Sequence, residues 1–511
     1  MTHTPQTKHV VSPMQQSFVD LPECLPDQSG ARGRRPGSAS QLLSRTGGVS
    51  LVDQIVRLIE IRITDKLLRT GARMPSIRQF ADLHSVSRFT VVEAYDRLVA
   101  LGFLESRRGS GFYVREKSAL RHDPGDRTAA CVAIRPQVDV VWLVRNMFRQ
   151  LPAQKKPGSG LLPNDWLDGS LVASALRGLS RQPPDLLLNY GTAQGFFPLR
   201  QQLQRKLATL EIAASADQIV TTAGVTQALD LVARHFTRSG DTIFVDDPAW
   251  FLMFGSFAML GAKVVGIPRM ADGPDLACLA EQAALHKPTM YVTTSVLHNP
   301  TSTSLSAAKA FQILKIAEKY NFMIVEDDIY CDMHPGTDVQ PATRLAALDQ
   351  LQRVIYLGGF SKTLAANLRV GFIAAAPGLA RDLADRKMLG SLTTGEIGER
   401  IVHRILSEGH YRKHLDRLRS KLDGVRDKII RQLEKTGMTV DLSTPAGLFV
   451  WADTHSDSNR MTELAMGQGY LLAPGSLFSP SQLPSTRMRF NVSSMNDPGV
   501  WRFLEQAIGR S

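Results

Sequence analysis

The stretch VIYLGGFSKT, Val354–Thr363, is the most informative indication of the fold of the larger part of this chain. Its first six residues are typical of a buried strand, so Lys362 is expected just beyond a strand end. A lysine held partly away from water can lose its proton and form a Schiff base with an aldehyde. An isolated Ser-Lys pair is more often structural. Whether Lys362 forms a Schiff base or is merely structural therefore has to be inferred from the motifs around it.

Short β-branched runs alternate with helix-length segments on both sides of this stretch. One such helical segment is SLSAAKAFQILKIAEKY, residues 304–320. The strand-like runs are TIFVDD at 242–247, AKVVGI at 262–267, TMYVTTS at 289–295, FMIVED at 322–327 and RVIYLGG at 353–359. Alternation of this kind predicts the α/β class, with a mainly parallel sheet.

Several polar motifs accompany Lys362 in a fixed order. They are Asn299 before Pro300, Asp327 and Tyr330 in VEDDIY, Arg369 in NLRVG, and the turn TAGVTQ at 222–227. In this order they resemble the fold-type I aminotransferases, which bind pyridoxal 5'-phosphate (PLP). The resemblance extends from about residue 140 to the C-terminus.

The resemblance implies a role for each of these residues toward PLP. Lys362 would hold the cofactor as a Schiff base, and Asp327 would keep its pyridine nitrogen protonated so that the ring acts as an electron sink. Tyr330 and Asn299 would hydrogen-bond its phenolic oxygen, and Trp250 would stack on the ring. The remaining cofactor-binding residues, chiefly around the phosphate, would be Gly224, Val225, Thr226, Ser361, Arg369 and Tyr190.

Two further matches concern a partner subunit and a ligand. Tyr190 resembles a tyrosine that reaches the cofactor phosphate of the neighbouring subunit, so a homodimer is implied. Arg489 in MRFN matches the arginine that binds the α-carboxylate of an amino acid. Gly359 and Ser302 depart from the family, which often has a hydroxyl residue at the first position and glycine at the second. No metal site is expected.

Residues 51–114 have a different pattern, with compact helical segments followed by a hairpin. Apolar residues at helical spacing from Val52 to Leu67 predict a first helix that ends before Gly71. Ser76 and Gln79 form a capping-box pattern for a second helix, and Ser87 can cap a third. Two short strands, 103–105 and 112–114, flank a glycine-rich tip, as in a wing.

The ordered combination resembles the GntR-type winged helix-turn-helix family, through MPSxR at 74–78, VSRxTV at 86–91 and GSG at 109–111. In a helix-turn-helix, residues at the start of the second motif helix meet base edges, and arginine reads guanine. Arg88 is therefore the best candidate for a base contact. By family analogy the residues that face DNA are Arg78, Ser87, Arg88, Thr90, Arg108 and Gly109.

Composition agrees with a two-part protein that meets a polyanion. At 511 residues the chain exceeds one hydrophobic core, and its net charge of +12 favours phosphate-rich partners. We expect an unstructured arm at 1–48, a DNA-binding domain at 49–115, a linker at 116–137 and an effector domain at 138–511. Four scattered cysteines, no signal pattern and no membrane-length apolar stretch predict a cytoplasmic protein.

A winged helix joined to an aminotransferase-like domain resembles the MocR subgroup of GntR regulators. The resemblance implies a transcriptional regulator that binds double-stranded operator DNA and senses an amine, an amino acid or PLP itself. The alternative is a PLP-dependent aminotransferase with an appended regulatory domain. The sequence leaves the promoter, the effector and the direction of regulation open.

Overall fold

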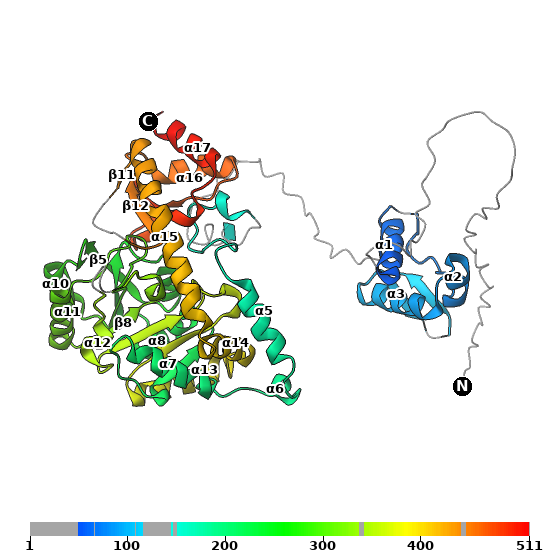
Figure 1. Ribbon diagram of the computed structural model, residues 1–511, viewed down its shortest axis with the longest axis horizontal. Coiled ribbons are helices and arrows are strands. Elements are labelled where there is room, and N and C mark those ends of the chain that lie inside the picture. Colours follow the sequence, from blue (N-terminus) through cyan, green and yellow to red (C-terminus); the bar gives the residue numbers. More distant parts are fainter. Residues whose placement is uncertain are drawn as a thin grey trace, which may run out of the picture. The chain divides into compact units, whose positions relative to one another are not determined.

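The computed structural model describes residues 50–65, 67–107, 109–115, 145–146, 151–336, 342–440 and 446–509. The chain divides into two compact units, residues 1–132 and 133–511 (Figure 1). The arm predicted at 1–48 and the linker predicted at 116–137 lie outside the described residues. The bounds of the four predicted segments therefore stay predictions.

The first unit is a small helical domain with one hairpin. Its elements are α1 (Leu51–Thr64), α2 (Ile77–His84), α3 (Arg88–Ala100), β1 (Leu104–Arg107) and β2 (Gly111–Val114). The hairpin strands pair antiparallel, with Leu104 opposite Val114. Its core is formed by apolar residues of the three helices and both strands, and Tyr95 is completely buried within it.

The predicted helix caps of this unit are confirmed. Ser76 and Gln79 form a reciprocal capping box at the start of α2, and the Ser87 hydroxyl accepts a hydrogen bond from the Thr90 amide at the start of α3. The first helix is shorter than predicted, because it ends at Thr64 and not near Leu67. Leu67 is 70% exposed, so it adds nothing to the buried face that stabilises the helix.

The second unit is built on an eight-stranded, mainly parallel sheet, as predicted from the alternating pattern. The strand order is β3, β10, β9, β8, β7, β4, β5, β6, and only β10 and β6 run antiparallel to their neighbours. The strands are β3 (Ile219–Thr222), β4 (Thr242–Asp247), β5 (Lys263–Met270), β6 (Gly273–Pro274), β7 (Met290–Thr293), β8 (Met323–Asp327), β9 (Val354–Gly359) and β10 (Gly371–Ala374).

All but the second of the following helices pack around this sheet, and that short helix projects from the side of the unit (Figure 1). They are α5 (Gly169–Leu179), α6 (Asp185–Leu188), α7 (Phe197–Ala208), α8 (Val225–Phe236), α9 (Leu252–Met259), α10 (Leu276–His286), α11 (Ala307–Tyr320), α12 (Leu345–Asp349), α13 (Pro377–Ser391) and α14 (Glu396–Ser407). Short 3-10 turns are η1 (Ala153–Lys155), η2 (Ala216–Gln218), η3 (Cys331–Met333) and η4 (Ala366–Leu368). The central strands β4, β7, β8 and β9 are almost fully buried, because helices cover both faces of a parallel sheet.

The C-terminal part of this unit is a smaller antiparallel sheet with its own helices. Its strand order is β11, β12, β14, β13. Its elements are β11 (Thr439–Val440), β12 (Phe449–Asp453), α16 (Ser458–Gly467), β13 (Ala473–Pro474), η5 (Gly475–Phe478), β14 (Arg487–Asn491), η6 (Val492–Ser494) and α17 (Pro498–Ile508). The long helix α15 (His410–Lys435) runs from α14 to this sheet (Figure 1).

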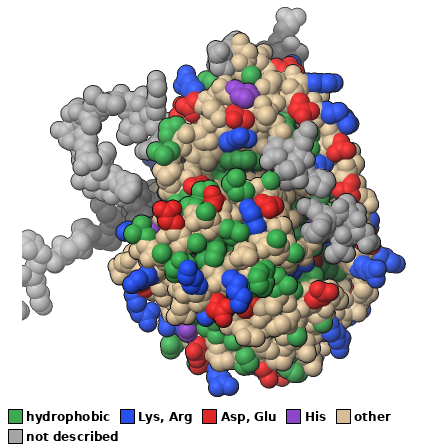
Figure 2. All heavy atoms as spheres, turned by 90° about the vertical axis from the view of Figure 1, so that its left-hand side faces the viewer, with side chains coloured by type: hydrophobic (Ala, Val, Ile, Leu, Met, Phe, Trp, Pro, Cys, Tyr) green, Lys and Arg blue, Asp and Glu red, His purple; other side chains and the backbone are tan. Residues whose placement is uncertain are grey.

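Charged side chains on the face that carries α10 and α11 are of mixed sign. Figure 2 shows basic and acidic side chains interspersed there, with hydrophobic side chains between them. Among the residues that the structure describes, this face therefore gathers no basic surface. Within the same described ranges, no helix is long and apolar enough to cross a membrane.

Candidate functional site

The predicted site residues gather at the carboxyl ends of the parallel strands. Asp327 is the last residue of β8, Asn299 lies in the loop after β7, and Lys362 follows β9. The carboxyl ends of parallel strands meet at one edge of a sheet, which is where α/β proteins bind their ligands. The topology thus brings together motifs that are 28 to 63 residues apart.

Lys362 is half-buried, and its amine lies 6.0 Å from the centre of the Tyr330 ring. Burial lowers the pKa of Lys362 to about 8, with help from the positive charges of Arg489 and Arg369, while the charge of Asp327 acts in the opposite direction. A tenth of such amines is neutral about one pH unit below this value. Lys362 is therefore a usable nucleophile near neutral pH.

Asp327 is buried at the end of β8. Its Oδ1 atom accepts a hydrogen bond from the Ile329 amide at 3.2 Å, and no described residue donates to Oδ2. Burial raises the pKa of Asp327 to about 7. A buried carboxyl with a free oxygen is suited to a cationic donor such as a protonated pyridine nitrogen.

Arg489 on β14 is 1% exposed and contacts the predicted residue Asn299 as well as a backbone carbonyl group. Its Nη1 donates to Asn299 Oδ1 at 2.7 Å, and its Nη2 donates to the Gly158 carbonyl oxygen at 2.6 Å. Its Nε has no hydrogen-bond partner among the described residues. Burial lowers the pKa of Arg489 to about 10. A buried guanidinium with an unused donor fits a carboxylate ligand.

Two aromatic rings hold this guanidinium in place. Its central carbon lies 4.4 Å from the centre of the Phe449 ring and 4.8 Å from that of Phe478. Phe449 also packs edge-on against Tyr330, with 5.3 Å between ring centres. We did not predict Phe449, Phe478 or the Gly158 carbonyl. No motif marks them, since any large apolar side chain or any carbonyl group suits these contacts.

The turn before α8 brings backbone amides and an arginine together. Gly224 has φ +80° and precedes the first turn of α8, so the amides of Val225 and Thr226 stand at a helix N-terminus. Arg369 donates to the Ala223 carbonyl oxygen at 2.8 Å, and a Cβ atom on Gly224 would lie 2.7 Å from its Nη2. The absence of a side chain at Gly224 thus leaves the arginine room beside these amides. This arrangement fits a phosphate group.

Three other predicted residues are not brought into contact with this group. Tyr190 is 81% exposed, as a residue that serves a neighbouring subunit would be. Trp250 is half-buried against the core of the unit, and Ser361 is half-buried next to Lys362. For these three, the roles stay predictions.

The two departures from the family pattern have different structural explanations. Ser302 has φ +59°, a conformation that favours glycine, yet its hydroxyl donates to the Phe449 carbonyl oxygen at 2.9 Å and so links its loop to β12. Gly359 lies where a Cβ atom would come within 2.9 Å of Ile329 Cδ1. A serine there would therefore press on a side chain beside Asp327.

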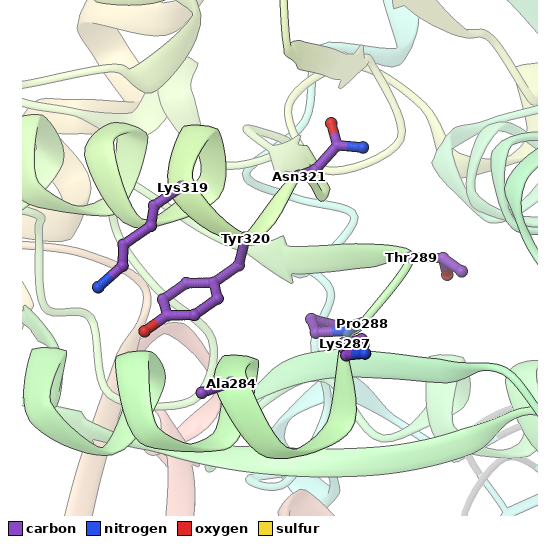
Figure 3. Close-up of a pocket in the computed structure, with 7 residues that line it drawn as sticks. All are labelled: Ala284, Lys287, Pro288, Thr289, Lys319, Tyr320 and Asn321. Carbon is purple, nitrogen blue, oxygen red and sulfur yellow. The ribbon is translucent and has the colours of Figure 1, made fainter.

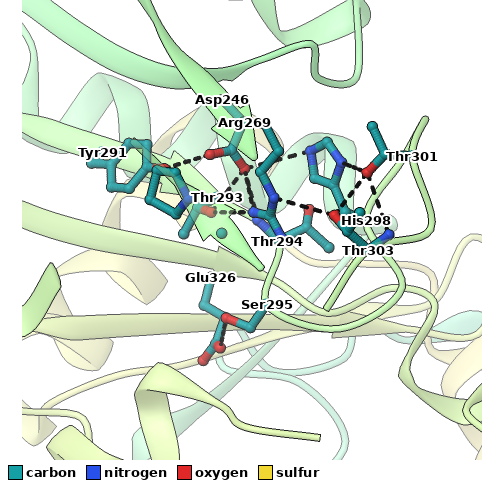
Figure 4. A network of polar contacts seen from close by, with 12 residues as sticks. Asp246, Arg269, Tyr291, Thr293, Thr294, Ser295, His298, Thr301, Thr303 and Glu326 are labelled. Atoms are coloured by element: carbon teal, nitrogen blue, oxygen red, sulfur yellow. Dashed lines mark hydrogen bonds and ion pairs between the residues drawn. The ribbon is translucent and has the colours of Figure 1, made fainter. Parts of the chain in front are cut away.

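A buried polar network supports the loop that carries Asn299 (Figure 4). Asp246 on β4 forms an ion pair with Arg269 at 3.0 Å and accepts hydrogen bonds from Tyr291 and Thr293. His298, directly before Asn299, lies 3.5 Å from Asp246 through Nε2. Burial, together with the charge of Arg269, lowers the pKa of His298 well below its usual range, so this imidazole is neutral.

A separate groove of about 580 Å³ lies at the other end of the sheet. It is lined by Ala284, Lys287, Pro288, Thr289, Lys319, Tyr320 and Asn321, and Figure 3 shows Tyr320 projecting from the end of α11 toward α10. These residues precede the amino ends of β7 and β8. The groove is therefore at the sheet edge opposite Asp327 and Asn299.

In the first unit, the start of α3 presents two unpaired side chains. Arg88 is exposed and makes no hydrogen bond or ion pair with the described residues, and Phe89 is 77% exposed. Ser87 and Thr90 are engaged with each other, 2.7 Å apart. The sequence shows a phenylalanine between Arg88 and Thr90, but the helical pattern alone does not reveal that its side chain is exposed.

The remaining predicted DNA contacts are placed unequally. Arg78 is exposed on α2, 4.0 Å from Asp82. Gly109, with φ +75°, forms the tip of the hairpin, while Arg108 lies outside the described residues. Its neighbour Arg107 is paired with Glu105 and lies over the Tyr113 ring, so this arginine is less free to contact a phosphate.

These features define a two-part class, in which a winged helix is joined to an aminotransferase-type α/β unit. The family model for aminotransferase class I and II matches residues 164–506, and the model for bacterial regulatory proteins of the gntR family matches residues 51–114. The chain thus belongs to the aminotransferase class I and II family and carries a GntR-type domain at its N-terminus. Membership of this family implies dependence on PLP.

Relatives of two kinds match the chain. YisV, an HTH-type transcriptional regulator of Bacillus subtilis, is 27% identical over 89% of this chain and 95% of its own length. The probable rhizopine catabolism regulatory protein MocR of Rhizobium meliloti is 27% identical over 85% and 88%. Among solved structures, Pyrococcus horikoshii kynurenine aminotransferase is 26% identical with a TM-score of 0.65, covering 72% of this chain and 92% of its own.

Proposed function

We propose that this protein is a DNA-binding transcriptional regulator whose aminotransferase-like domain senses an amine or amino acid through PLP. The extent of the matches carries this proposal. Relatives named as regulators match across both units, whereas the aminotransferase structure above covers only 72% of the chain. A catalyst has no use for a winged helix, but a regulator does.

The residues of the second unit suit a reversible covalent sensor. When bound, PLP supplies an aldehyde that reacts reversibly with amines and a ring that withdraws electrons. Lys362 provides an amine with a pKa of about 8, and Asp327 provides a buried carboxyl for the ring nitrogen. The amides after Gly224 and the Arg369 guanidinium hold the phosphate group. Tyr330 and Asn299 would hydrogen-bond the phenolic oxygen of the ring.

Arg489 gives the sensor its selectivity. Its Nε is unused, and its Nη1 bond to Asn299 can be exchanged for a bond to a carboxylate. An effector that carries both an amine and a carboxylate would therefore compete with Lys362 and engage Arg489 at once. These new contacts are the differential interaction that a ligand needs in order to shift a two-state equilibrium.

The DNA-reading surface lies at the start of α3 and at the hairpin tip. Arg88 is free to read guanine, and the exposed ring of Phe89 is suited to the methyl group of thymine. Arg78 and Gly109 would face the DNA backbone beside them. Ser87 and Thr90 fix the first turn of the helix, so that Arg88 and Phe89 are presented in a defined direction.

The regulator would act as a homodimer formed by the second unit. Tyr190 is exposed, and it follows Leu188, which is 79% exposed; Leu389 on α13 is 87% exposed. A subunit interface that includes these side chains would remove their apolar surface from water. Two subunits would supply two DNA-reading domains, so the operator should contain two related half-sites.

A working aminotransferase is the second candidate, because the set from Asn299 to Arg489 is nearly complete. The regulator and the enzyme can be distinguished with DNA that the full-length protein selects from a random pool. Candidate amino acids should change binding of the wild type to this DNA, and the Lys362→Ala and Arg489→Ala variants should no longer respond. Effectors that act equally on both variants, or fast multiple turnover as the main activity, would favour the enzyme.

A further inference from the structure

The residue after the proposed cofactor lysine is held from two sides by the first turns of α15. The Thr363 hydroxyl lies 2.5 Å from the Tyr411 hydroxyl, and the Thr363 carbonyl oxygen lies 2.7 Å from His414 Nε2. Thr363 is completely buried, and the other two residues are at most 5% exposed. Water therefore cannot substitute for either contact.

The direction of each hydrogen bond follows from the chemistry of the partners. Tyr411 donates its single proton to Asp332 Oδ2 at 2.7 Å, because a carboxylate only accepts. The Thr363 hydroxyl must then donate to Tyr411. Burial alone would raise the pKa of Asp332, but the ion pair with Lys206 brings it below the usual range, so this acceptor stays charged.

The second contact is fixed in the same way. A carbonyl oxygen only accepts, so His414 Nε2 carries the proton that it donates to Thr363. Burial lowers the pKa of His414, which keeps the ring neutral. The side chain and the carbonyl group of Thr363 are thus both bound to one helix, which restrains the backbone next to Lys362.

The helix that supplies these contacts is also anchored in its second half. Arg426 donates to the carbonyl oxygens of Gly447 and Phe449 at 2.9 and 2.8 Å, and Phe449 carries the ring that packs on Arg489. Arg426 follows Tyr411 by 15 residues, which is roughly 22 Å along an α-helix. α15 is therefore a fixed support between the small sheet and the lysine.

We propose that Thr363, Tyr411 and His414 are positioning residues, which hold Lys362 so that its amine meets the aldehyde of PLP. The proposal rests on the proposed function, in which Lys362 binds PLP. It predicts that breaking the contacts weakens the covalent part of cofactor binding and leaves the phosphate and ring contacts intact.

The test compares PLP with pyridoxine 5'-phosphate, which has the same ring and phosphate group but no aldehyde. In the full-length protein, Thr363→Val removes one buried hydrogen bond to Tyr411 and should bind PLP roughly tenfold more weakly. Tyr411→Phe removes that bond and the one to Asp332, so its loss should be at least as large. Their affinity for pyridoxine 5'-phosphate should be unchanged. Thr363→Ser keeps the hydroxyl and should restore PLP binding.

Thr436→Val is the matched control, since Thr436 is also buried, directly follows α15 and donates to the Leu433 carbonyl oxygen at 2.6 Å. It should lower the unfolding temperature and leave both affinities at the wild-type value. If Thr363→Val weakens the binding of both ligands equally, the role of the three residues is merely structural. If it weakens the binding of neither, the three residues do not position Lys362. If the wild type binds PLP no better than pyridoxine 5'-phosphate, the proposed function fails instead.

Discussion

Lys362 can be tested on its own, because its burial has a measurable consequence for pH dependence. Only the neutral amine attacks an aldehyde, and with a pKa of about 8 its neutral fraction is about one tenth at pH 7 and about nine tenths at pH 9. The rate at which PLP attaches to the cofactor-free protein should therefore rise about tenfold between these values and then level off. Stopped-flow absorbance measures this rate.

The charged groups that face Lys362 provide the control. Asp327 raises the pKa of the lysine, whereas Arg489 and Arg369 lower it. In Asp327→Asn the rise in rate should move to lower pH, since the attractive charge is gone. A rate that keeps rising tenfold per unit from pH 8 to pH 10 would mean that Lys362 behaves as an ordinary surface lysine.

Phe89 yields a test at the scale of one methyl group. If its exposed ring contacts thymine, replacing that thymine by deoxyuridine in the selected DNA should weaken binding about fourfold, the value for roughly 0.8 kcal/mol. Phe89→Ala should bind both DNAs alike. Leu83→Ala, at a residue on α2 that is 61% exposed, is the matched control and should keep the wild-type discrimination. If Phe89→Ala distinguishes the two DNAs as strongly as the wild type does, another residue contacts the methyl group.

How far single residues could be predicted depends on whether their chemistry requires one amino acid. Lys362, Asp327 and Arg489 need a particular functional group, so motifs identify them. Phe449 and the Gly158 carbonyl could not be foreseen, since they contact Arg489 through a generic ring and through the backbone. The Gly158 contact spans 331 residues of sequence, and no local pattern encodes such a separation.

The turn before α8 is the element whose geometry can be tested most directly. Gly224→Ala would strain a residue with φ +80° and place a Cβ atom 2.7 Å from Arg369 Nη2. We expect it to weaken PLP and pyridoxine 5'-phosphate alike, by about tenfold or more, because both would place a phosphate group at this turn. Equilibrium titration with both ligands measures this effect.

Gly240→Ala shows which part of the effect is due to backbone strain alone. Gly240 has φ +93°, but a Cβ atom there would meet nothing within 4 Å. This variant should lose about 1 kcal/mol of stability and keep both affinities. If the two alanine variants bind the ligands equally well, the turn before α8 does not hold the phosphate group.

Elements were predictable where a hydrophobic period and a cap coincide. The starts of α2 and α3 follow from Ser76 and Ser87, and the parallel strands follow from short β-branched runs. The end of α1 was misplaced, because Leu67 continues the apolar period but packs against nothing that buries it. The antiparallel strand β10 could not be foreseen either, since a short apolar run does not reveal its direction.

For the whole molecule, subunit exchange decides whether the homodimer shares its sites. If Tyr190 serves the partner's cofactor, a dimer of one Tyr190→Phe chain and one Lys362→Ala chain has one intact site, built from the lysine of the first and the tyrosine of the second. Random mixing makes half of the dimers mixed, so about one site in four should bind PLP with wild-type affinity. If Tyr190 instead serves the cofactor site of its own subunit, the mixed dimer has no intact site. Refolded equimolar mixtures, titrated with PLP by absorbance, distinguish the two outcomes, and each variant alone shows how far its own defect weakens binding.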